Sequence, residues 1–286
     1  MAEGIVIDGK ALASKVRDQV RADVEALKGS NHQVRLDAIL VGGDQGALLY
    51  AKNQARACEK VGMTYCLHEL NGDTREADVL DLIAQLNTED AVTGIMVHMP
   101  LPSQMNAETI QSAIAVNKDV EGVNPANIGN VVFGRRSLVP CTALAVMELI
   151  ESTGVKLEGA NVVCVGASRI VGKPVAVLLM QAEATVISTN HHTKDRPNLT
   201  RHADIVVSAA GVPNLIGADD ISEGTIVIDV GINRIENGEG KKITVGDVDF
   251  DAVKEKASYI SPVPGGVGPM TVAMLLRNTV QAAERA

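Results

Sequence analysis

Short apolar runs of strand length alternate with longer amphipathic helical patterns along most of the chain. Strands are expected over residues 34–41, 63–70, 94–98, 162–165, 185–188, 205–208 and 225–230. Helices are expected over residues 11–27, 48–61, 75–86, 107–115, 143–153, 170–181 and 271–286. Repeated strand–helix units predict parallel sheets covered by helices, because two parallel strands need a crossover connection. The expected fold class is therefore α/β.

A segment rich in Gly, Asn and Pro, residues 118–140, interrupts this alternation and is expected to be a loop. A second series of strands and helices follows it. With 286 residues the chain is long enough for two domains. We expect one α/β domain over residues 1–145 and another over residues 146–270.

The core of these domains must be aliphatic, because the chain has no Trp, two Phe and three Tyr, whereas apolar residues make up 46% of it. That composition suits buried parallel strands. A net charge of −9 without a run of Lys or Arg argues against binding to nucleic acid. No apolar stretch reaches the roughly 20 residues that cross a bilayer, and the first residues show no signal peptide. A cytoplasmic protein without membrane contact is expected.

The cysteines show no spacing that is typical of a metal site. They are Cys58, Cys66, Cys141 and Cys164, and no two of them form a CxxC pair. We expect reduced and mostly buried thiols. The adjacent histidines His191 and His192 would need further ligands to bind a metal, and none can be located in the sequence. No metal site is predicted.

The segment from Asn161 to Pro174 has the pattern of a strand, a tight turn and the start of a helix. Its glycines, Gly166 and Gly172, are separated by five residues and do not follow the GxGxxG spacing. Gly166 would allow a sharp turn with close backbone approach, and Gly172 would let the helix pack on the sheet. Free amides at the helix start could bind phosphate oxygens. Such turns also occur without a nucleotide, so both interpretations stay open.

The next expected strand ends without the carboxylate that holds the ribose 2′-hydroxyl in NAD-selective folds. No acidic residue precedes Asp195 there. A 2′-phosphate would not be repelled, which favours NADP, with NAD still possible. The alternative is a solvated loop. The side chains that could attract the phosphate are His191, His192, Lys194 and Arg196.

Several segments, in order and with fitting spacing, together resemble one enzyme family. They are Val41-Gly42 followed by Tyr50, GIMVHMPLP at 94–102, KDVEG at 118–122 with Asn124-Pro125, PCT at 140–142, GASRIVGKP at 166–174, IDVGIN at 228–233, VGDV at 245–248 and PVPGGVGPMT at 262–271. The chain is similar to the bifunctional methylenetetrahydrofolate dehydrogenase/methenyltetrahydrofolate cyclohydrolase family. The resemblance spans essentially the whole chain.

The resemblance implies two α/β domains, the second a Rossmann-like dinucleotide-binding domain, with the active-site cleft between them. It also implies that the C-terminal helix, residues 271–286, packs back on the first domain, and that two chains dimerise through the cofactor domain. Family members oxidise methylene-tetrahydrofolate to methenyl-tetrahydrofolate with NADP. They then hydrolyse that cation to formyl-tetrahydrofolate, so the expected substrate is a folate one-carbon adduct.

The resemblance also implies the residues of the site, with Tyr50 orienting the folate and Glu121 anchoring it. The expected substrate-binding residues are Tyr50, Gln54, His98, Met99, Pro100, Leu101, Glu121, Pro262, Gly265 and Gly266. The expected cofactor-binding residues are Thr142, Gly166, Ala167, Ser168, Arg169, Ile170, His191, His192, Thr193, Ala210, Gly211, Val230, Gly231, Ile232, Gly268 and Thr271. The segment 262–269 would form a side-chain-poor wall for flat rings, or a tight connection between domains; the two are compatible.

The expected catalytic residues are Tyr50, Gln54, His98 and Glu121; Tyr50 keeps the family's pattern, and the other three depart from it. The family has a Lys four residues after the Tyr, on the same helix face, and this chain has Gln54. Lys52 should point elsewhere, because it is two residues from Tyr50. The other departures are His98 for Gln, Glu121 for Asp, Ala47 for Ser and Ala143 for Pro.

Our first hypothesis is that cyclohydrolase activity is lost or much reduced. The Lys of the family is the expected acid/base for water, whereas Gln54 cannot transfer a proton at neutral pH. Hydride transfer needs no such base, so NADP-dependent dehydrogenase activity is the primary expectation. The alternative is compensated drift that leaves the usual activities intact.

Our second hypothesis is that His98 is a new proton carrier, since the reference pKa of histidine is near 6.5. It would serve a tetrahydrofolate-dependent transferase that removes a one-carbon unit from a methylated or halogenated donor. The alternative is that His98 only hydrogen-bonds Gln54. A non-catalytic folate-binding homologue is a third possibility.

Overall fold

The computed structural model describes residues 3–29, 33–43, 45–135, 138–236 and 240–285. The chain divides into two compact units, each assembled from two stretches of sequence. Unit 1 contains Met1–Ala13 and Thr142–Thr271, and unit 2 contains Ser14–Cys141 and Val272–Ala286. Both units are built from parallel strands and helices, so the expected α/β class is confirmed.

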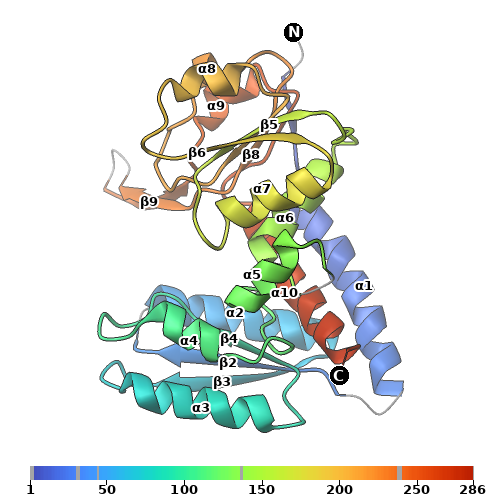
Figure 1. Cartoon of the computed structure of the whole chain (residues 1–286), viewed down its shortest axis with the longest axis vertical. Coiled ribbons are helices and arrows are strands. Elements are labelled where there is room, and N and C mark those ends of the chain that lie inside the picture. The colour runs from blue at the N-terminus through green and yellow to red at the C-terminus, as the bar shows by residue number, and fades with distance from the viewer. Residues whose placement is uncertain (1–2, 30–32, 44, 136–137, 237–239, 286) are drawn as a thin grey trace. The chain divides into compact units, whose positions relative to one another are not determined.

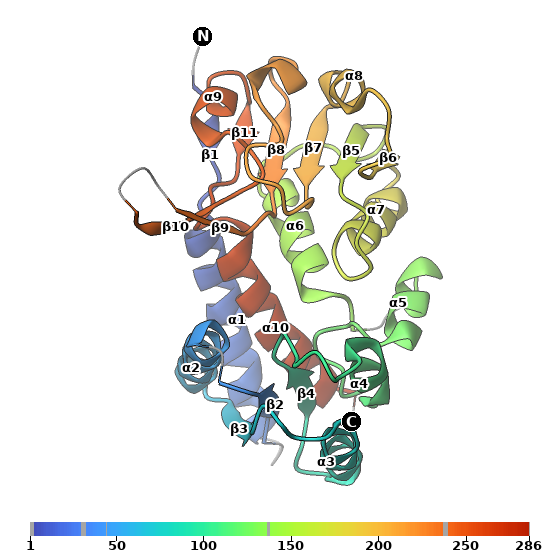
Figure 2. The same ribbon diagram turned by 90° about the vertical axis from the view of Figure 1, so that its left-hand side faces the viewer.

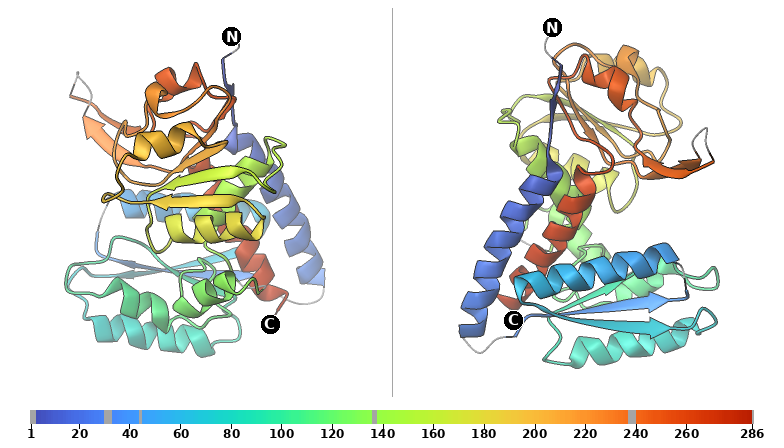
Figure 3. Two further views of the ribbon diagram at one scale, coloured as in Figure 1. Left: turned by 45° about the horizontal axis from the view of Figure 1, so that its top comes forward. Right: turned by 180° about the vertical axis from the view of Figure 1, so that it is seen from behind.

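Unit 2 contains a three-stranded parallel sheet in the order β3-β2-β4. The central strand β2 (Arg35–Val41) pairs with β3 (Thr64–Leu70) on one side and with β4 (Gly94–Val97) on the other. Helix α2 (Gln45–Val61) covers one face of this sheet and α3 (Glu76–Thr88) covers the other (Figures 1 and 3). The candidate residues Tyr50 and Gln54 therefore lie on a helix packed directly on the sheet.

The face of this sheet toward α3 carries an aliphatic core, as the composition predicted. Its central buried side chains are Ile39, Ile83, Ile95, Ile110 and Ile114. Helix α4 (Ala107–Ala113) adds to this core and begins after the Asn106 side chain, which accepts hydrogen bonds from two backbone N–H groups of its first turn. Asn is a favoured residue at this capping position.

The segment 118–140 was expected to be a loop, and this prediction is wrong for its middle part. Helix α5 (Pro125–Val132) lies there. Its signals are local: the Asn124 side chain accepts a hydrogen bond from Ala126 N at 2.8 Å, and Pro125 occupies the first turn. Residues 136–137 of the expected loop lie outside the described residues.

Unit 1 contains a six-stranded sheet in the order β1-β11-β8-β7-β5-β6, in which every pairing is parallel. Figure 2 shows these strands side by side. The strands are β1 (Ile5–Val6), β5 (Asn161–Val165), β6 (Thr185–Thr189), β7 (Ile205–Ser208), β8 (Ile226–Asp229) and β11 (Tyr259–Ile260). This arrangement is the Rossmann-like sheet that the sequence predicted.

Several short elements of unit 1 were absent from the expectations. They are α8 (Arg196–Arg201), the 3-10 turn η1 (Ala218–Asp220), the hairpin of β9 (Asn233–Glu236) with β10 (Lys242–Val245), and α9 (Phe250–Lys254). The longer helices were expected: α6 (Cys141–Glu151), α7 (Gly172–Gln181) and, at the C-terminus, α10 (Val267–Ala283). Short elements bury few residues, so periodicity alone gives little signal for them.

The units to which the two ends of the chain belong were compared with the expected domain boundaries, and the N-terminal end differs from them. Strand β1 pairs with β11, so the first residues belong to unit 1 and not to the domain expected over residues 1–145. Helix α1 (Gly9–Gly29) follows β1. At the other end, Asn278 on α10 donates to the carbonyl oxygens of Val120 and Val139, both at 2.9 Å, within unit 2. Ala286, the last residue of the expected helix, lies outside the described residues.

No helix among the described residues has the length and apolar character needed to span a membrane. Likewise, the described part of the chain holds no group of three or more His, Cys, Asp or Glu that could bind a metal. All four cysteines are free, and three of them are buried, as expected.

Candidate functional site

The first group of candidate residues lies on one face of α2 in unit 2. Tyr50 and Gln54 are one helical turn apart, and their side chains are 41% and 1% exposed. Lys52 is exposed to solvent on the same helix, so it does not replace the missing lysine. A buried amide therefore takes the place of the ammonium group that the family pattern calls for.

Tyr65 joins Gln54 to His98, and the sequence did not single it out. Its hydroxyl lies 3.3 Å from His98 Nε2 and 3.4 Å from Gln54 Oε1. Tyr65 comes from β3, whereas His98 directly follows β4, on the far side of β2. The Tyr50 ring meets the His98 ring edge-on, with centroids 5.9 Å apart. Tyr50, Gln54, Tyr65 and His98 thus form one cluster. The position of Tyr65 in it follows from the pairing of β3 and β4 with β2, which the sequence pattern does not give.

His98 does not have the acid–base character that was expected from its reference pKa. Its side chain is 3% exposed, and burial lowers its pKa to about 4. The ring is neutral at neutral pH and only weakly basic, because a buried site disfavours the charged form. The expected titration near 6.5 is therefore corrected by the structure. The structure also places Tyr65 between His98 and Gln54, where a direct hydrogen bond was the alternative.

Glu121 lies in a loop that is anchored by the buried carboxylate of Asp119. Asp119 Oδ2 accepts hydrogen bonds from Asn124 N and from Asn127 Nδ2, both at 2.8 Å. Burial, followed by the charge of Asp119, raises the pKa of Glu121 to about 7. Burial and the negative charge of Glu121 raise the pKa of the Tyr50 hydroxyl as well. Glu121 is thus the group of this site that titrates near neutral pH.

The residues after His98 complete the expected folate side. Met99 is exposed, the Met99–Pro100 peptide is cis, and Leu101 packs against the core below α3 and α4. The buried Cys141 thiol donates to the Val120 carbonyl at 3.2 Å, and burial raises its pKa. These contacts hold the segment around Glu121 against the start of α6.

In unit 1, the turn between β5 and α7 has the close packing that the glycines predicted. Gly166 has φ +106°, and a Cβ built there would lie 2.2 Å from the Ala209 carbonyl oxygen. A Cβ on Gly172 would lie 2.0 Å from the Gly166 carbonyl oxygen. Both approaches are too short for any side chain, so the close backbone approach expected at Gly166 is confirmed, and Gly172 lets the start of α7 approach the turn at Gly166 and Ala167. Ser168 Oγ accepts from the first helical amide, Gly172 N, at 3.2 Å.

This turn borders a cavity of about 820 Å³ at the carboxyl ends of β5, β6 and β7. Seven of the expected cofactor residues line it: Gly166, Ala167, Ser168, His191, His192, Thr193 and Ala210. Lys173, Asn190, Arg196, Val212 and Leu215 line it as well. Its size falls within the roughly 300–1,000 Å³ of ligand pockets, and its place is the usual ligand site of parallel sheets.

Basic side chains line this cavity from two elements: Lys173 from α7, and His191, His192 and Arg196 from the segment after β6. The rings of His191 and His192 have centroids 3.8 Å apart. Arg196 Nη1 is buried with no hydrogen-bond partner among the described residues, and Nη2 lies 3.6 Å from Asp220 Oδ1. A buried donor without a partner is costly, so this cavity fits an anionic group.

The other expected cofactor residues do not line this cavity. Ile170 is exposed beside the turn, Arg169 neighbours it, and Gly211 lies on the loop after β7. Thr142 lies on α6 and Thr271 on α10, and these two residues are the first and last of the longer sequence stretch of unit 1.

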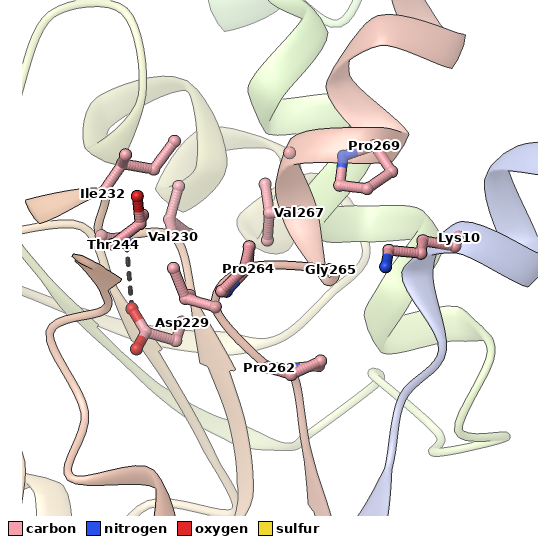
Figure 4. Close-up of a pocket in the computed structure, with 13 residues that line it drawn as sticks. Lys10, Asp229, Val230, Ile232, Thr244, Pro262, Pro264, Gly265, Val267 and Pro269 are labelled. Carbon is pink, nitrogen blue, oxygen red and sulfur yellow. Dashed lines mark hydrogen bonds between the residues drawn. The ribbon is translucent and has the colours of Figure 1, made fainter. Parts of the chain in front are cut away.

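A second, smaller cavity of about 170 Å³ combines expected substrate and cofactor residues of unit 1 (Figure 4). Those expected from the sequence are Val230, Gly231, Ile232, Pro262, Gly265 and Gly268. Lys10, Asp229 and Thr244 also line it and were not expected. Gly266 does not line it; its N–H donates to the Pro262 carbonyl at 2.8 Å and tightens the turn. The segment 262–269 therefore forms a wall of this cavity.

Asp247 ties together the loops that border both cavities. Its Oδ2 accepts hydrogen bonds from Ala210 N at 2.7 Å and Gly211 N at 3.1 Å, and its Oδ1 accepts from Val212 N at 3.0 Å. Asp229 Oδ1 in turn accepts from Asp247 N at 3.0 Å. In the sequence, Asp229 and Asp247 stand out only as members of the IDVGIN motif at 228–233 and the VGDV motif at 245–248. Their role is to satisfy buried backbone N–H groups.

Replacing Asp247 with Asn should weaken cofactor binding roughly tenfold and lower the melting temperature. The amide NH₂ would face backbone donors, and each buried donor left unpaired costs about 1–3 kcal/mol. Titration with NADP and thermal unfolding measure both effects. Asp251→Asn, an exposed change on α9, is the matched control. Unchanged NADP affinity in a folded Asp247→Asn protein would contradict this role.

Sequence and structure comparisons identify relatives over the whole chain. Residues 7–121 match the sequence model of the tetrahydrofolate dehydrogenase/cyclohydrolase catalytic domain, and residues 140–286 match that of its NAD(P)-binding domain. Bifunctional protein FolD from Moorella thermoacetica is 46% identical over 280 residues, covering 98% of this chain and 99% of the relative. The crystal structure of the bifunctional enzyme FolD from Campylobacter jejuni superposes with a TM-score of 0.94 at 43% identity, covering 98% of both chains. The Trypanosoma brucei enzyme complexed with NADP cofactor and inhibitor has a TM-score of 0.94 at 36% identity, covering 100% of this chain and 99% of that one.

Proposed function

Because the chain belongs to the tetrahydrofolate dehydrogenase/cyclohydrolase family, we propose that it oxidises methylene-tetrahydrofolate to methenyl-tetrahydrofolate with NADP. The family match covers both halves of the chain. The observation that carries the proposal is the cavity of unit 1 beside the Gly166 turn, with its buried and unpartnered Arg196 guanidinium nitrogen. That site fits the phosphates of a dinucleotide.

The residues of unit 2 bind the folate adduct, but position 54, where the family has its lysine, holds no group that can carry a proton. Tyr50 offers a partly exposed ring, and Glu121 offers a carboxylate for the pterin's N–H donors. NADP, when bound, accepts the hydride, so the chain's own residues need only hold and orient the two reactants. Gln54 can hydrogen-bond but cannot carry a proton. We therefore propose that the cyclohydrolase step is lost or much reduced.

Two assays on the purified protein test this function. Methylene-tetrahydrofolate with NADP should yield NADPH, while methenyl-tetrahydrofolate should be hydrolysed no faster than in buffer alone. Folate binding without NADPH formation would instead indicate a one-carbon transferase or a non-catalytic homologue. Rapid hydrolysis by the wild type would contradict the proposed loss.

The preference for NADP should depend on Arg196. In Arg196→Met the cavity keeps the alkyl part of the side chain but loses the guanidinium group. We expect the KM for NADP to rise about tenfold, because a charge-assisted hydrogen bond to phosphate contributes roughly 1.5–3 kcal/mol. The KM for NAD, which has no 2′-phosphate, should stay within about twofold. Arg201→Met, on the same helix α8, is the control; an equal rise for both cofactors would contradict 2′-phosphate recognition.

Assembly and location stay predictions. The homodimer through the cofactor unit is supported by exposed apolar side chains, Met180 on α7 and Ile187 on the edge strand β6. The cytoplasmic location and the absence of nucleic-acid binding rest on the sequence alone.

A further inference from the structure

The hydroxyl of Tyr65 occupies the centre of a buried polar cluster that the proposed chemistry does not yet use. It lies within hydrogen-bonding distance of two groups, His98 Nε2 at 3.3 Å and Gln54 Oε1 at 3.4 Å. Gln54 and His98 are almost fully buried, so water cannot readily substitute for Tyr65. The three side chains come from α2, β3 and the end of β4, which are all elements of unit 2.

The number of protons in this cluster determines which group donates. Tyr65 has a single O–H, and the carbonyl oxygen Gln54 Oε1 can only accept. The Tyr65 proton is therefore directed to Gln54, and His98 Nε2 must carry a proton that it donates to the Tyr65 oxygen. A neutral imidazole holds one proton, so His98 Nδ1 is left with its lone pair.

The same order of hydrogen bonds determines the orientation of the Gln54 amide. With Oε1 held by Tyr65, the NH₂ group points away from the phenol. Gln54 Nε2 is buried and has no partner within hydrogen-bonding distance and angle among the described residues, and its remaining polar interaction is a weak one with the Tyr50 hydroxyl, whose pKa burial raises and Gln54 lowers slightly. A buried donor in this state costs about 1–3 kcal/mol unless an acceptor is supplied. An oxygen acceptor on a bound ligand would satisfy it.

We propose that Tyr65 is a positioning residue that sets the tautomer of His98 and directs the Gln54 amide donors toward an acceptor oxygen of the folate adduct. This inference rests on the proposed function for the identity of the ligand. The tautomer and the amide orientation follow from the cluster alone. Tyr65 acts through its two neighbours, Gln54 and His98, with which its hydroxyl makes its hydrogen bonds.

The test uses the full-length wild type and Tyr65→Phe, which removes the hydroxyl and keeps the ring. In protein labelled with ¹⁵N-histidine, the His98 signal is identified by its disappearance in His98→Asn. We expect protonated Nε2 in the wild type and a shift toward a mixture of tautomers in Tyr65→Phe. The kcat/KM for methylene-tetrahydrofolate should fall roughly tenfold, while the KM for NADP should stay unchanged. Tyr259→Phe, on β11 of unit 1, is the matched control.

Two results would overturn the proposal. One is a wild-type His98 that carries its proton on Nδ1, a measurement that does not depend on the variant folding. The other is a folded Tyr65→Phe protein with an unchanged tautomer and unchanged kcat/KM. Absence of NADPH formation in the wild type would refute the dehydrogenase function, while the tautomer comparison would still decide the role of Tyr65.

Discussion

Replacing Gln54 with Lys should raise the hydrolysis of methenyl-tetrahydrofolate by two orders of magnitude or more. A positioned acid/base group contributes roughly 10²–10⁴-fold to such a step. Position 54 is 1% exposed, and burial lowers the pKa of an ammonium group toward the range in which it can accept a proton. NADPH formation should change little, because hydride transfer does not use this group. The measurement is the rate of loss of the methenyl cation in buffered solution, corrected for the uncatalysed rate.

A matched control comes from the same helix. Asn53→Lys places an identical side chain one residue earlier, at an exposed position. It should leave hydrolysis at the wild-type level. If Gln54→Lys folds, forms NADPH and still fails to hydrolyse the cation, then Gln54 is not the reason for the reduced activity.

Replacing Glu121 with Gln should lower kcat/KM for the folate adduct about 10- to 100-fold at pH 8. In its proposed role the carboxylate accepts hydrogen bonds from pterin N–H groups, and hydrogen bonds to a charged group contribute about 1.5–3 kcal/mol. The pKa of Glu121 is about 7, and only the ionised form accepts from every donor. In the wild type, kcat/KM should therefore rise as the pH passes upward through about 7. The variant should lose this rise.

The same substitution should stabilise the folded chain. The pKa of Glu121 is raised from 4.5 to about 7, so between these values the folded state holds a proton that the unfolded state has released. The free energy of unfolding of the wild type therefore falls as the pH rises through this window. At pH 8 the variant avoids this cost, which is on the order of 3 kcal/mol. Below pH 4.5 the difference should disappear.

Urea unfolding at several pH values measures this effect beside the kinetics. Glu69→Gln, an exposed change on β3, is the control and should alter neither quantity. If the variant binds folate poorly but its free energy of unfolding at pH 8 equals that of the wild type, the ionised Glu121 does not destabilise the folded chain.

Much of this fold was predictable because its long elements have strong hydrophobic periods. Strand β7 (Ile205–Ser208) was predicted to the residue, since its four buried side chains follow the polar residues Arg201, His202 and Asp204 and precede a segment of small residues with Gly211. Strand β1 was missed because its two residues, Ile5 and Val6, are both exposed and pair only with β11. Helix α5 was not predicted because it lies in a segment whose Gly, Asn and Pro are typical of loops. Asn124 followed by Pro125 is, however, also a common start of a helix.

The candidate site was predictable where a motif carries it and not where contacts across strands build it. Gly166 and Gly172 could be interpreted from spacing alone, and the structure gives both the close approach that this required. Tyr65 could not be interpreted in this way. Its importance depends on the strand order, which places β3 and β4 on opposite sides of β2 and so brings Tyr65 to His98. The pKa of His98 was misjudged for a related reason: a reference value contains no burial.

The hydrogen bonds from Asn278 to the carbonyls of Val120 and Val139 have a consequence for synthesis on the ribosome. The loop that presents Glu121 is translated well before Asn278, which lies 158 residues after Val120. Nascent domains generally fold as units while translation proceeds. The loop that presents Glu121 therefore gains these hydrogen bonds only once Asn278 has been translated, so a nascent chain that stops before Asn278 would hold the loop without them.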